Sequence, residues 1–419
     1  MKKFISFIAL AAVMLTVAMS VPACNQGGGD KTAGLEGEKG KKVSVLIPGH
    51  NPGDAEAWQN KAVAAFKAAY PDVEVEFVVA TWENWETKLL ASISGDEPID
   101  VINDGANNNP RFPLRGITQP VEPYINMENP NLHKVTMDSV FKFNGHYYVA
   151  VSETNTAVIY YNKTLFENEG VDDPGTLYSS GNWNFDSFAR VAKEITSTAQ
   201  KRFGYATNYP YLFFGANKTS ALKLGAGAKY ELNLTAPELR RSLQLIEDGW
   251  IVSKWSGYEG DPWVAFYKGT AAMLGDFQWI DRQILDARQL GLADFDYGVV
   301  PMPHGPDNAD KLNSITAAGW AIGNGADCPN HAGKLIDMLV DAQADYLKTT
   351  DEKIDAAHVA LYKELAQKPF CTNSYDSGVG GAYDLVSAII DEGKSVSQAL
   401  ESLKPVYQRK IDEINNNTK

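Results

Sequence analysis

The chain has 419 residues, of which 44% are hydrophobic and 21% are charged. One hydrophobic core rarely serves so long a chain, so these values predict a globular protein with two domains. The formal net charge of −14 argues against a nucleic-acid partner, because phosphate contacts need clustered Lys and Arg. No basic run appears beyond the first residues and Lys41-Lys42.

The first 23 residues have the pattern of a signal peptide. Lys2 and Lys3 precede an apolar stretch, Phe4–Met19, which is too short to span a bilayer and is followed by small residues. The end of this segment, Val21-Pro22-Ala23-Cys24, resembles a bacterial lipobox, in which cleavage before the cysteine leaves its thiol to carry a lipid. The alternative is a plain secretory signal with an incidental Cys24.

Residues 24–42 are rich in Gly and charge and contain almost nothing apolar. Such a segment cannot bury enough surface to order itself, which predicts a lipidated flexible tether. We therefore expect an acidic protein outside the cytoplasm, in the periplasm or at the outer face of the cytoplasmic membrane. It would contact the membrane only through its lipid.

Beyond the lipobox, the chain has two cysteines, Cys328 and Cys371. In an exported protein these two residues could form a disulfide. Sequence separation alone does not show how close they lie, so two buried free thiols are the default interpretation.

Residues that carry chemistry in enzymes and metal sites are sparse. The chain has no Gly-x-Ser-x-Gly elbow, no phosphate-binding loop and no His-Glu-x-x-His motif. Six His are scattered without metal-ligand spacing. We therefore expect neither a metal nor a cofactor. A carboxylate pair for glycoside hydrolysis stays open, because any acidic protein contains candidates.

From residue 42 onward, strand and helix patterns alternate. Strands are expected at 43–47, 73–79 and 98–104, and helices at about 54–70 and 83–94. This alternation predicts a parallel sheet with right-handed crossovers. Ligands of such sheets bind beyond the carboxyl ends of the strands, which singles out the loops that contain Asn51, Trp82 and Asp104. Trp82 could instead pack on its own helix.

Two β-type runs, His146–Val151 and Ala157–Tyr161, flank five polar residues, Ser152–Thr156. The polar residues include neither Gly nor Pro, whereas a tight hairpin would normally carry a Gly signal. An extended crossing between two sheets, with polar side chains facing a groove, is the better interpretation. An ordinary solvated loop is the alternative.

In the second half of the chain, helices are expected at 163–169, from about 183, at 237–249, at 329–350 and through much of the segment after 354. A buried strand ending at Asp276 delivers Phe277-Gln278-Trp279 into a loop. Another strand covers 297–301, and Gly319-Trp320 lies inside an apolar run.

Aromatic side chains recur in the predicted loops. Sugar rings stack their C–H faces on such side chains, while sugar hydroxyls need planar acceptors and donors, so these loops fit a carbohydrate cleft. The alternative for each Trp is core packing, to which we assign Trp58, Trp85 and Trp250. The loop aromatics are Trp82, Trp183, Tyr209, Tyr211, Trp255, Trp263, Trp279 and Trp320.

A series of short motifs, each weak alone, is specific in its order and spacing. The motifs are Ser94-Gly95-Asp96-Glu97-Pro98-Ile99-Asp100-Val101, Gly145-His146-Tyr147-Tyr148-Val149-Ala150, Tyr161-Asn162-Lys163-Thr164-Leu165-Phe166-Glu167, Gly269-Thr270-Ala271-Ala272-Met273, Pro301-Met302-Pro303 and Gly319-Trp320-Ala321-Ile322. With them, nearly all of residues 43–419 resembles the family 1 extracellular solute-binding proteins of ABC transporters.

The resemblance implies an α/β fold of the two-lobed periplasmic-binding-protein type II, with mostly parallel sheets flanked by helices and a hinge of two or three crossings. We expect residues 43–152 and 299–350 in the first lobe, and 153–298 and 351–419 in the second. With the loops singled out above, the expected ligand contacts are Asn51, Trp82, Asp104, Glu153, Asn155, Tyr209, Asp276, Phe277, Trp279, Gly319 and Trp320. Which of Glu153 and Asn155 touches the ligand stays open.

The resemblance also implies a function. A monomer would capture a sugar or oligosaccharide between its lobes and deliver it to an ABC transporter permease, without breaking a bond. Three alternatives remain: the same fold could bind another solute, such as a polyamine, a metal chelate or an oligopeptide; the chain could be a secreted glycosidase; or it could be an adhesin or sensor.

Overall fold

The structure is a computed structural model that describes residues 31–38, 41–372, 376 and 378–416. The predicted signal peptide, Cys24 and the first part of the predicted tether lie outside these residues. Within the described ranges, no helix has the length and apolar character needed to cross a bilayer.

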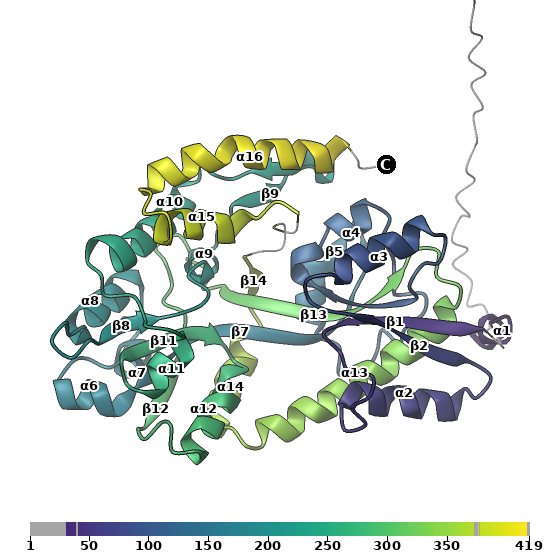
Figure 1. Ribbon diagram of the computed structural model, residues 1–419, viewed down its shortest axis with the longest axis horizontal. Helices are drawn as coiled ribbons and strands as arrows, with labels where there is room; N and C mark the ends of the chain where they lie inside the picture. Colours follow the sequence, from purple (N-terminus) through teal and green to yellow (C-terminus); the bar gives the residue numbers. More distant parts are fainter. Residues whose placement is uncertain (1–30, 39–40, 373–375, 377, 417–419) are drawn as a thin grey trace, which may run out of the picture.

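Hydrogen-bonded strands run through the whole length of the molecule (Figure 1). Their order is β2-β1-β3-β13-β7-β11-β8, with β12 beside β7 and with β4 and β14 beside β13. These strands are β1 Lys42–Pro48, β2 Glu74–Ala80, β3 Val101–Gly105, β4 Thr118–Gln119, β7 Ala150–Asn162, β8 Phe203–Ala206, β11 Ala271–Phe277, β12 Tyr297–Pro301, β13 Asn313–Gly323 and β14 Pro369–Cys371. Two small ribbons pair β5 Lys142–Phe143 with β6 His146–Tyr147, and β9 Leu222–Leu224 with β10 Tyr230–Leu232.

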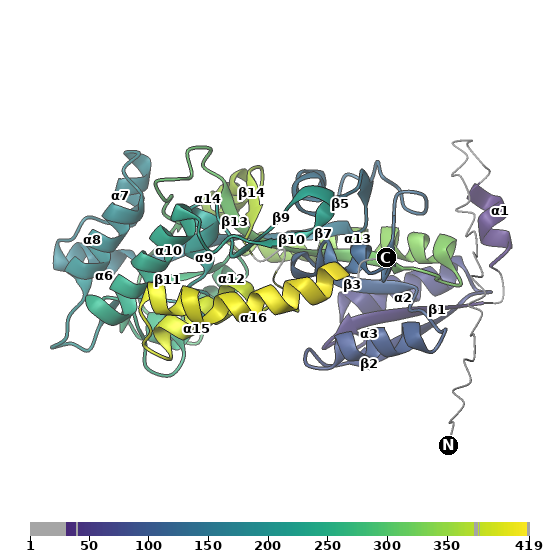
Figure 2. The ribbon, with the colours of Figure 1, turned by 90° about the horizontal axis from the view of Figure 1, so that it is seen from above.

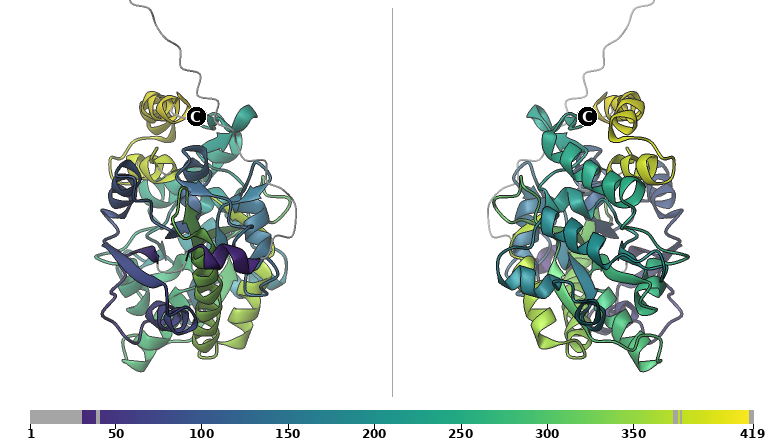
Figure 3. Two further views of the ribbon diagram at one scale, coloured as in Figure 1. Left: turned by 90° about the vertical axis from the view of Figure 1, so that its right-hand side faces the viewer. Right: turned by 90° about the vertical axis from the view of Figure 1, so that its left-hand side faces the viewer.

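Helices surround the strands in both views along the long axis (Figure 3). They are α1 Lys31–Glu36, α2 Trp58–Ala69, α3 Trp85–Ser94, α4 Arg111–Leu114, α5 Lys134–Thr136, α6 Lys163–Glu169, α7 Pro174–Ser179, α8 Phe185–Ile195, α9 Leu212–Ala216, α10 Pro237–Glu247, α11 Pro262–Tyr267, α12 Ile280–Gln289, α13 Pro329–Asp351, α14 Ala356–Leu365, α15 Gly381–Ile390 and α16 Val396–Asn416. Short helical turns occupy Ala106–Asn108, Met137–Phe141, Ala226–Ala228 and Asp248–Val252.

The molecule has two lobes, each with its own main hydrophobic core. Val45, Leu89 and Leu339 belong to the core of the first lobe, under α2, α3 and α13. Phe213 and Leu243 belong to the core of the second lobe, under α8, α9, α10 and α15. The lobes lie side by side along the long axis, and α16 runs along the second lobe (Figure 2). The predicted two-lobed α/β fold is confirmed.

Two long strands, β7 and β13, belong to both lobes. The first part of β7, Ala150–Thr156, pairs antiparallel with β13, and the second part, Ala157–Tyr161, pairs with β11. β13 in turn pairs antiparallel with β3 of the first lobe. The pairs of β1 with β2 and β3, and of β8 with β11, are parallel. The polar residues 152–156 therefore lie in one continuous extended strand, as predicted, and do not form a solvated loop.

The predicted division of the lobes needs a correction at residue 299. β12 pairs with the second half of β7, and Val300 and Met302 pack in the core of the second lobe. The chain returns to the first lobe only along β13, because this strand reaches β3. Cys371, which was expected in the second lobe, packs in the first core because β14 pairs with β13.

The end of the predicted tether is docked on the first lobe. Residues 31–36 form α1, and the side chain of Glu38 is buried against the start of α13. Its Oε1 accepts hydrogen bonds from the backbone N and Nδ2 of Asn330, at 3.0 and 2.6 Å. Its Oε2 accepts hydrogen bonds from the backbone N of His331, at 2.9 Å, and from Nδ1 of the same residue, at 2.8 Å. The first N–H groups of a helix lack partners within the helix, so a carboxylate is stabilised there. A flexible tether up to residue 42 was therefore a wrong prediction.

Cys328 and Cys371 are both buried free thiols. The default interpretation is confirmed, and the structure contains no disulfide between them. Burial raises the pKa of the Cys328 thiol to about 12, so this thiol is unreactive at neutral pH.

Candidate functional site

Four aromatic rings line one edge of the second lobe. Tyr209 and Tyr211 follow β8, and Phe277 and Trp279 lie at the end of β11. Because β8 and β11 are parallel neighbours, their carboxyl ends meet at one edge of the sheet. The ring centroids lie 5.9 Å apart for Tyr211 and Tyr209, 5.4 Å for Tyr209 and Phe277, and 4.6 Å for Phe277 and Trp279. We call these four residues the aromatic ladder.

Asp276 lies behind the aromatic ladder and is fully buried. Its Oδ1 accepts a hydrogen bond from the backbone N of Phe277, at 2.7 Å, and its Oδ2 accepts one from Nε1 of Trp263, also at 2.7 Å. Burial raises the pKa of this carboxyl to about 7. Because both oxygens are engaged within the lobe, the predicted direct contact of Asp276 with a ligand is wrong. The carboxyl holds the backbone of Phe277 in place instead.

The first lobe carries a group of polar side chains at the carboxyl end of β3, which we call the polar cluster. The cluster consists of Asp104, Asn108, Arg111 and Glu86. Oδ1 of Asp104 accepts hydrogen bonds from the backbone N of Gly105, at 2.9 Å, and from Nδ2 of Asn108, at 2.8 Å. Burial raises the pKa of the Asp104 carboxyl to about 7, although these two hydrogen bonds favour its ionised form.

Arg111 organises the rest of the polar cluster. Its Nη1 and Nη2 donate to the two carboxylate oxygens of Glu86, each at 2.8 Å. The residue is only 4% exposed, and its Nε has no hydrogen-bond partner among the described residues. A buried donor without a partner costs about 1–3 kcal/mol, so this atom is available for a ligand that supplies an acceptor.

A segment of the second lobe, which contains Asp376 and Gly378, reaches the polar cluster of the first lobe. A Cβ on Gly378 would lie 3.6 Å from Nη1 of Arg111, so this segment approaches the first lobe closely. Asp376, two residues earlier, uses Oδ2 to accept a hydrogen bond from the backbone N of Ala382, at 2.8 Å, while its buried Oδ1 has no partner among the described residues. Burial raises the pKa of the Asp376 carboxyl to about 7.

The same carboxyl acts electrostatically on the aromatic ladder. The pKa of Tyr211 is raised, first by burial and then by the charges of Tyr209 and Asp376. We therefore group the aromatic rings of the second lobe and the buried polar groups of both lobes as the candidate site. Each lobe contributes one unpartnered polar atom, Nε of Arg111 and Oδ1 of Asp376.

Glu153 and Asn155 are joined to each other in the crossing strand β7. Oε1 of Glu153 accepts a hydrogen bond from Nδ2 of Asn155, at 2.6 Å, and its Oε2 accepts one from Nε2 of Gln343 on α13, at 2.9 Å. Glu153 also lines a cavity of about 980 Å³ between the first lobe and α14. Which of the two residues contacts a ligand stays a prediction.

Gly319 and Trp320 have structural roles, which corrects the sequence-based prediction. Trp320 is 1% exposed in the first core and packs edge-on against Trp58, with ring centroids 6.3 Å apart. A Cβ on Gly319 would lie 2.2 Å from the backbone O of Ala150, so the close approach of β13 and β7 requires Gly. Trp320 therefore cannot stack on a ligand.

Two other loop aromatics are also core residues. Trp183 donates from Nε1 to the backbone O of Pro301, at 2.8 Å, and Trp255 donates from Nε1 to Oδ2 of Asp248, at 3.0 Å. Both side chains are buried. Their indole N–H groups have partners inside the protein, whereas Nε1 of Trp320 has none among the described residues.

Trp82 and Asn51 lie at the expected loops and are exposed. Trp82 is 68% exposed, and a Cβ on Gly49, whose φ is +71°, would lie 2.6 Å from its Nε1. Oδ1 of Asn51 accepts a hydrogen bond from the backbone N of Gly53, at 3.0 Å. Both residues stay predictions as ligand contacts.

Sequence reasoning missed Arg111, Glu86 and Asp376 as site residues, and it noted Tyr211 only as a loop aromatic. Asp376 stands among glycines, and Arg111 follows a run of Asn residues and Pro110. These local patterns mark loops but carry no sign of a charge that will be buried. The Tyr209-Pro210-Tyr211 spacing was the one available signal, because it places two rings in a single turn.

Two α/β lobes that share two crossing strands, with a site bordered by both lobes, define a binding protein of the two-lobed type. The family described as bacterial extracellular solute-binding protein matches residues 50–346, and the chain belongs to this family. A binding protein of Brucella abortus (strain 2308) is 24% identical over 323 residues, which cover 74% of this chain and 74% of that protein.

Solved structures show the same fold. An ABC substrate-binding protein from Listeria monocytogenes, in complex with cycloalternan, superposes with a TM-score of 0.67 at 19% identity and covers 90% of this chain and 98% of its own. UgpB from Mycobacterium tuberculosis, in complex with glycerophosphocholine, has a TM-score of 0.67 at 17% identity, with 89% and 99% covered. At these identities the likeness establishes the fold.

Proposed function

We propose that this solute-binding protein is the extracytoplasmic component of an ABC importer and that its solute is a sugar or oligosaccharide. The proposal is supported by the aromatic ladder on one lobe and the polar cluster on the other, together with the approach of Gly378 to Arg111. The protein would hold the sugar and deliver it to a permease without breaking a bond.

The aromatic ladder and the polar cluster, which we take as the two walls of the site, favour a polyol as the solute. Sugar rings present C–H faces that stack on aromatic side chains such as Tyr209 and Trp279, while Phe277 is buried beneath them. A hydroxyl group both donates and accepts hydrogen bonds, so neighbouring hydroxyls can accept from Nε of Arg111 and donate to Oδ1 of Asp376. Pairing these buried atoms removes the penalty of leaving them without partners, which is about 1–3 kcal/mol for each group.

Closure of the lobes would follow from the same contacts. A solute that touches both walls only when the lobes approach each other binds the closed form more tightly and shifts the population toward it. The crossing strands β7 and β13 and the connection from α13 to α14 are the segments that would bend.

We also propose that Cys24 carries the lipid anchor and that the protein acts as a monomer. The lipobox pattern and the family support the first point. Mass spectrometry of the mature amino terminus tests it, with a diacylated cysteine as the expected result. A mass near 45 kDa or below by light scattering in detergent-free buffer, on a Cys24→Ser chain, is the result expected for a monomer.

The binding test is a calorimetric screen of mono- and oligosaccharides, with polyamines and glycerophosphocholine as competing solute classes. We expect a sugar to bind the parent chain and to lose at least tenfold in affinity in the Tyr209→Ala and Trp279→Ala variants. Leu290→Ala, which changes an exposed side chain just after α12, is the matched control. Binding of a polyamine or of glycerophosphocholine alone would contradict the sugar assignment.

A further inference from the structure

The second lobe contains a cavity of about 620 Å³ that is separate from the candidate solute site. The turn between α7 and α8, the segment from β12 to β13 and the turn from α14 to β14 form its walls. No residue of the aromatic ladder or of the polar cluster lines it. Its volume falls in the range of pockets that bind small organic molecules.

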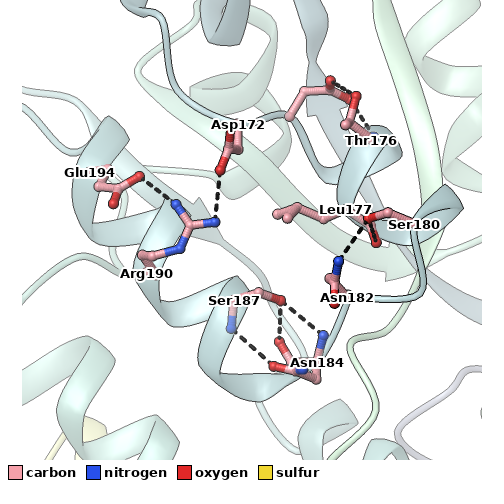
Figure 4. Close-up of polar contacts among 10 residues, drawn as sticks. Asp172, Thr176, Leu177, Ser180, Asn182, Asn184, Ser187, Arg190 and Glu194 are labelled. Carbon is pink, nitrogen blue, oxygen red and sulfur yellow. Dashed lines mark hydrogen bonds and ion pairs between the residues drawn. The ribbon is translucent and has the colours of Figure 1, made fainter.

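One wall of this cavity is held rigidly by bonds within the protein. Asn184 forms a capping box with Ser187 at the start of α8 (Figure 4). Arg190 on the same helix bridges Asp172 and Glu194, with both distances at 3.0 Å (Figure 4). Of these residues, Asn184 lines the cavity, and its side chain is engaged by the capping box, while the ion pairs of Arg190 fix α8 from the outside.

The opposite end of the cavity is cationic. Nε2 of His304 is buried and has no hydrogen-bond partner in the described part of the chain. Lys311 and Lys368 line the same end, and neither has an ion-pair partner among the described residues. Burial lowers the pKa of the His304 imidazole, Asn313 opposes this shift, and the charges of both lysines add to it. A positive field at an unpartnered nitrogen favours an anion.

The rest of the lining combines apolar and polar side chains, and the buried side chains of Trp183, Phe185 and Leu365 contribute to it. Two carboxylates also line the cavity, Asp186 on α8 and Glu364 on α14, and the charge of Glu364 together with burial raises the pKa of Tyr178. The charges that act on His304 are those of the two lysines, so the end at His304 suits an anion and the end at Trp183 and Leu365 suits a ring.

We propose that this cavity binds a small organic carboxylate with an aromatic or apolar body. The carboxylate pairs with the ammonium groups of Lys311 and Lys368 and accepts a hydrogen bond from Nε2 of His304. The ring packs along Trp183 and Leu365. When Nδ1 of His304 carries the proton of the neutral imidazole, Nε2 can donate only after it gains a second proton. Binding of the carboxylate therefore takes up a proton.

Isothermal titration of the full-length mature protein with phenylacetate tests the proposal. 2-Phenylethanol, which has the same ring without the charge, and inorganic phosphate, which has charge without the ring, are the matched probes. We expect saturable binding of phenylacetate that is at least tenfold tighter than that of either probe. We also expect tighter binding at pH 6 than at pH 8. Phenylacetate is ionised at both pH values, so its own charge does not change.

Variants locate the binding. Lys311→Met and Lys368→Met should each weaken phenylacetate binding roughly tenfold, in line with a charge-assisted hydrogen bond, and His304→Gln should remove the pH dependence. Lys404→Met, an exposed lysine on α16, is the control and should bind as the parent does. Trp279→Ala, at the exposed end of the aromatic ladder, should also leave this binding unchanged.

The proposal is overturned by equal affinity for phenylacetate and 2-phenylethanol, by equal affinity at the two pH values, or by lysine variants that bind as the parent does. Loss of binding in Trp279→Ala alone would place the carboxylate in the solute site and would also overturn it. None of these results depends on which solute the aromatic ladder binds.

Discussion

The two walls of the candidate site are built in different ways. On the first lobe, Asp104, Asn108 and Arg111 of the polar cluster are almost fully buried, and Arg111 is fixed by two hydrogen bonds to the partly exposed Glu86. On the second lobe, the aromatic ladder ends in Trp279, which is 36% exposed. Changes in the first wall should therefore cost folding stability as well as binding, whereas changes at the exposed end of the second should cost binding alone.

The largest expected effect is a loss of folding stability, and it distinguishes Trp320 of the first core from Trp279 of the aromatic ladder. Trp320→Ala empties a site in the first core and should lower the free energy of unfolding by about 3–5 kcal/mol. Urea unfolding followed by circular dichroism measures this loss, and the folded fraction should keep the solute affinity of the parent. An unchanged unfolding free energy would contradict the packing of Trp320 on Trp58.

The second effect concerns pH. Asp104 has a pKa of about 7 in the folded protein, against about 3.9 in an unfolded chain. A carboxyl with a raised folded pKa contributes stability that is complete below pH 4 and is lost as the pH rises through 7. Asp104→Asn keeps an acceptor oxygen for both hydrogen bonds and should remove this loss.

The stability gained by Asp104→Asn relative to the parent should therefore grow between pH 4.5 and pH 8, by on the order of 2–4 kcal/mol. Urea unfolding at the two pH values measures the difference. Asp138→Asn, an exposed carboxyl on the first lobe, is the control. The same gain at both pH values would mean that Asp104 is not buried as a neutral acid.

Next in size is the ion pair of the first wall. Arg111→Met leaves the Glu86 carboxylate without its bidentate partner and should lower the unfolding free energy by about 2–3 kcal/mol, because one charge is stranded in a partly buried place. Arg115→Met, which is exposed, should change it by less than about 0.5 kcal/mol. Adding Glu86→Gln to Arg111→Met should restore part of the loss.

The smallest effect is expected at the exposed end of the aromatic ladder. Trp279→Ala should lower solute affinity about tenfold, which corresponds to about 1.4 kcal/mol, with little change in stability. Titration calorimetry and thermal unfolding on the same sample measure both quantities. A large fall in melting temperature would show that the ladder is as structural as the polar cluster, and the contrast between the walls would fail.

Local patterns predicted much of the fold. The alternation from residue 42 onward indicated parallel strands and crossover helices, and β1, β2 and β3 confirm it. The absence of Gly and Pro between Ser152 and Thr156 predicted the extended crossing, which the structure confirms in β7. These features depend on neighbouring residues, and for this reason a single sequence reveals them.

The errors came from contacts that are distant in sequence. Trp320 stands in an apolar run beside a Gly, and only the packing of α2 on β13 decides that its ring is buried. The role of Arg111 depends on Glu86 in α3 and on the approach of Gly378 from the other lobe. Docking of Glu38 on α13 was equally hidden, because the Gly-rich composition around it suggests a tether.

The bonds of Glu38 to α13 bear on how the protein is presented to its partner. If Cys24 bears a lipid, the linker reaches the first lobe at α1, and the residues from Cys24 to Lys31 span at most about 25 Å when fully extended. Such an anchor would be attached to the first lobe alone. The first lobe would then stay close to the bilayer, and the second lobe would move relative to it. The loaded protein would therefore approach a permease in a defined orientation.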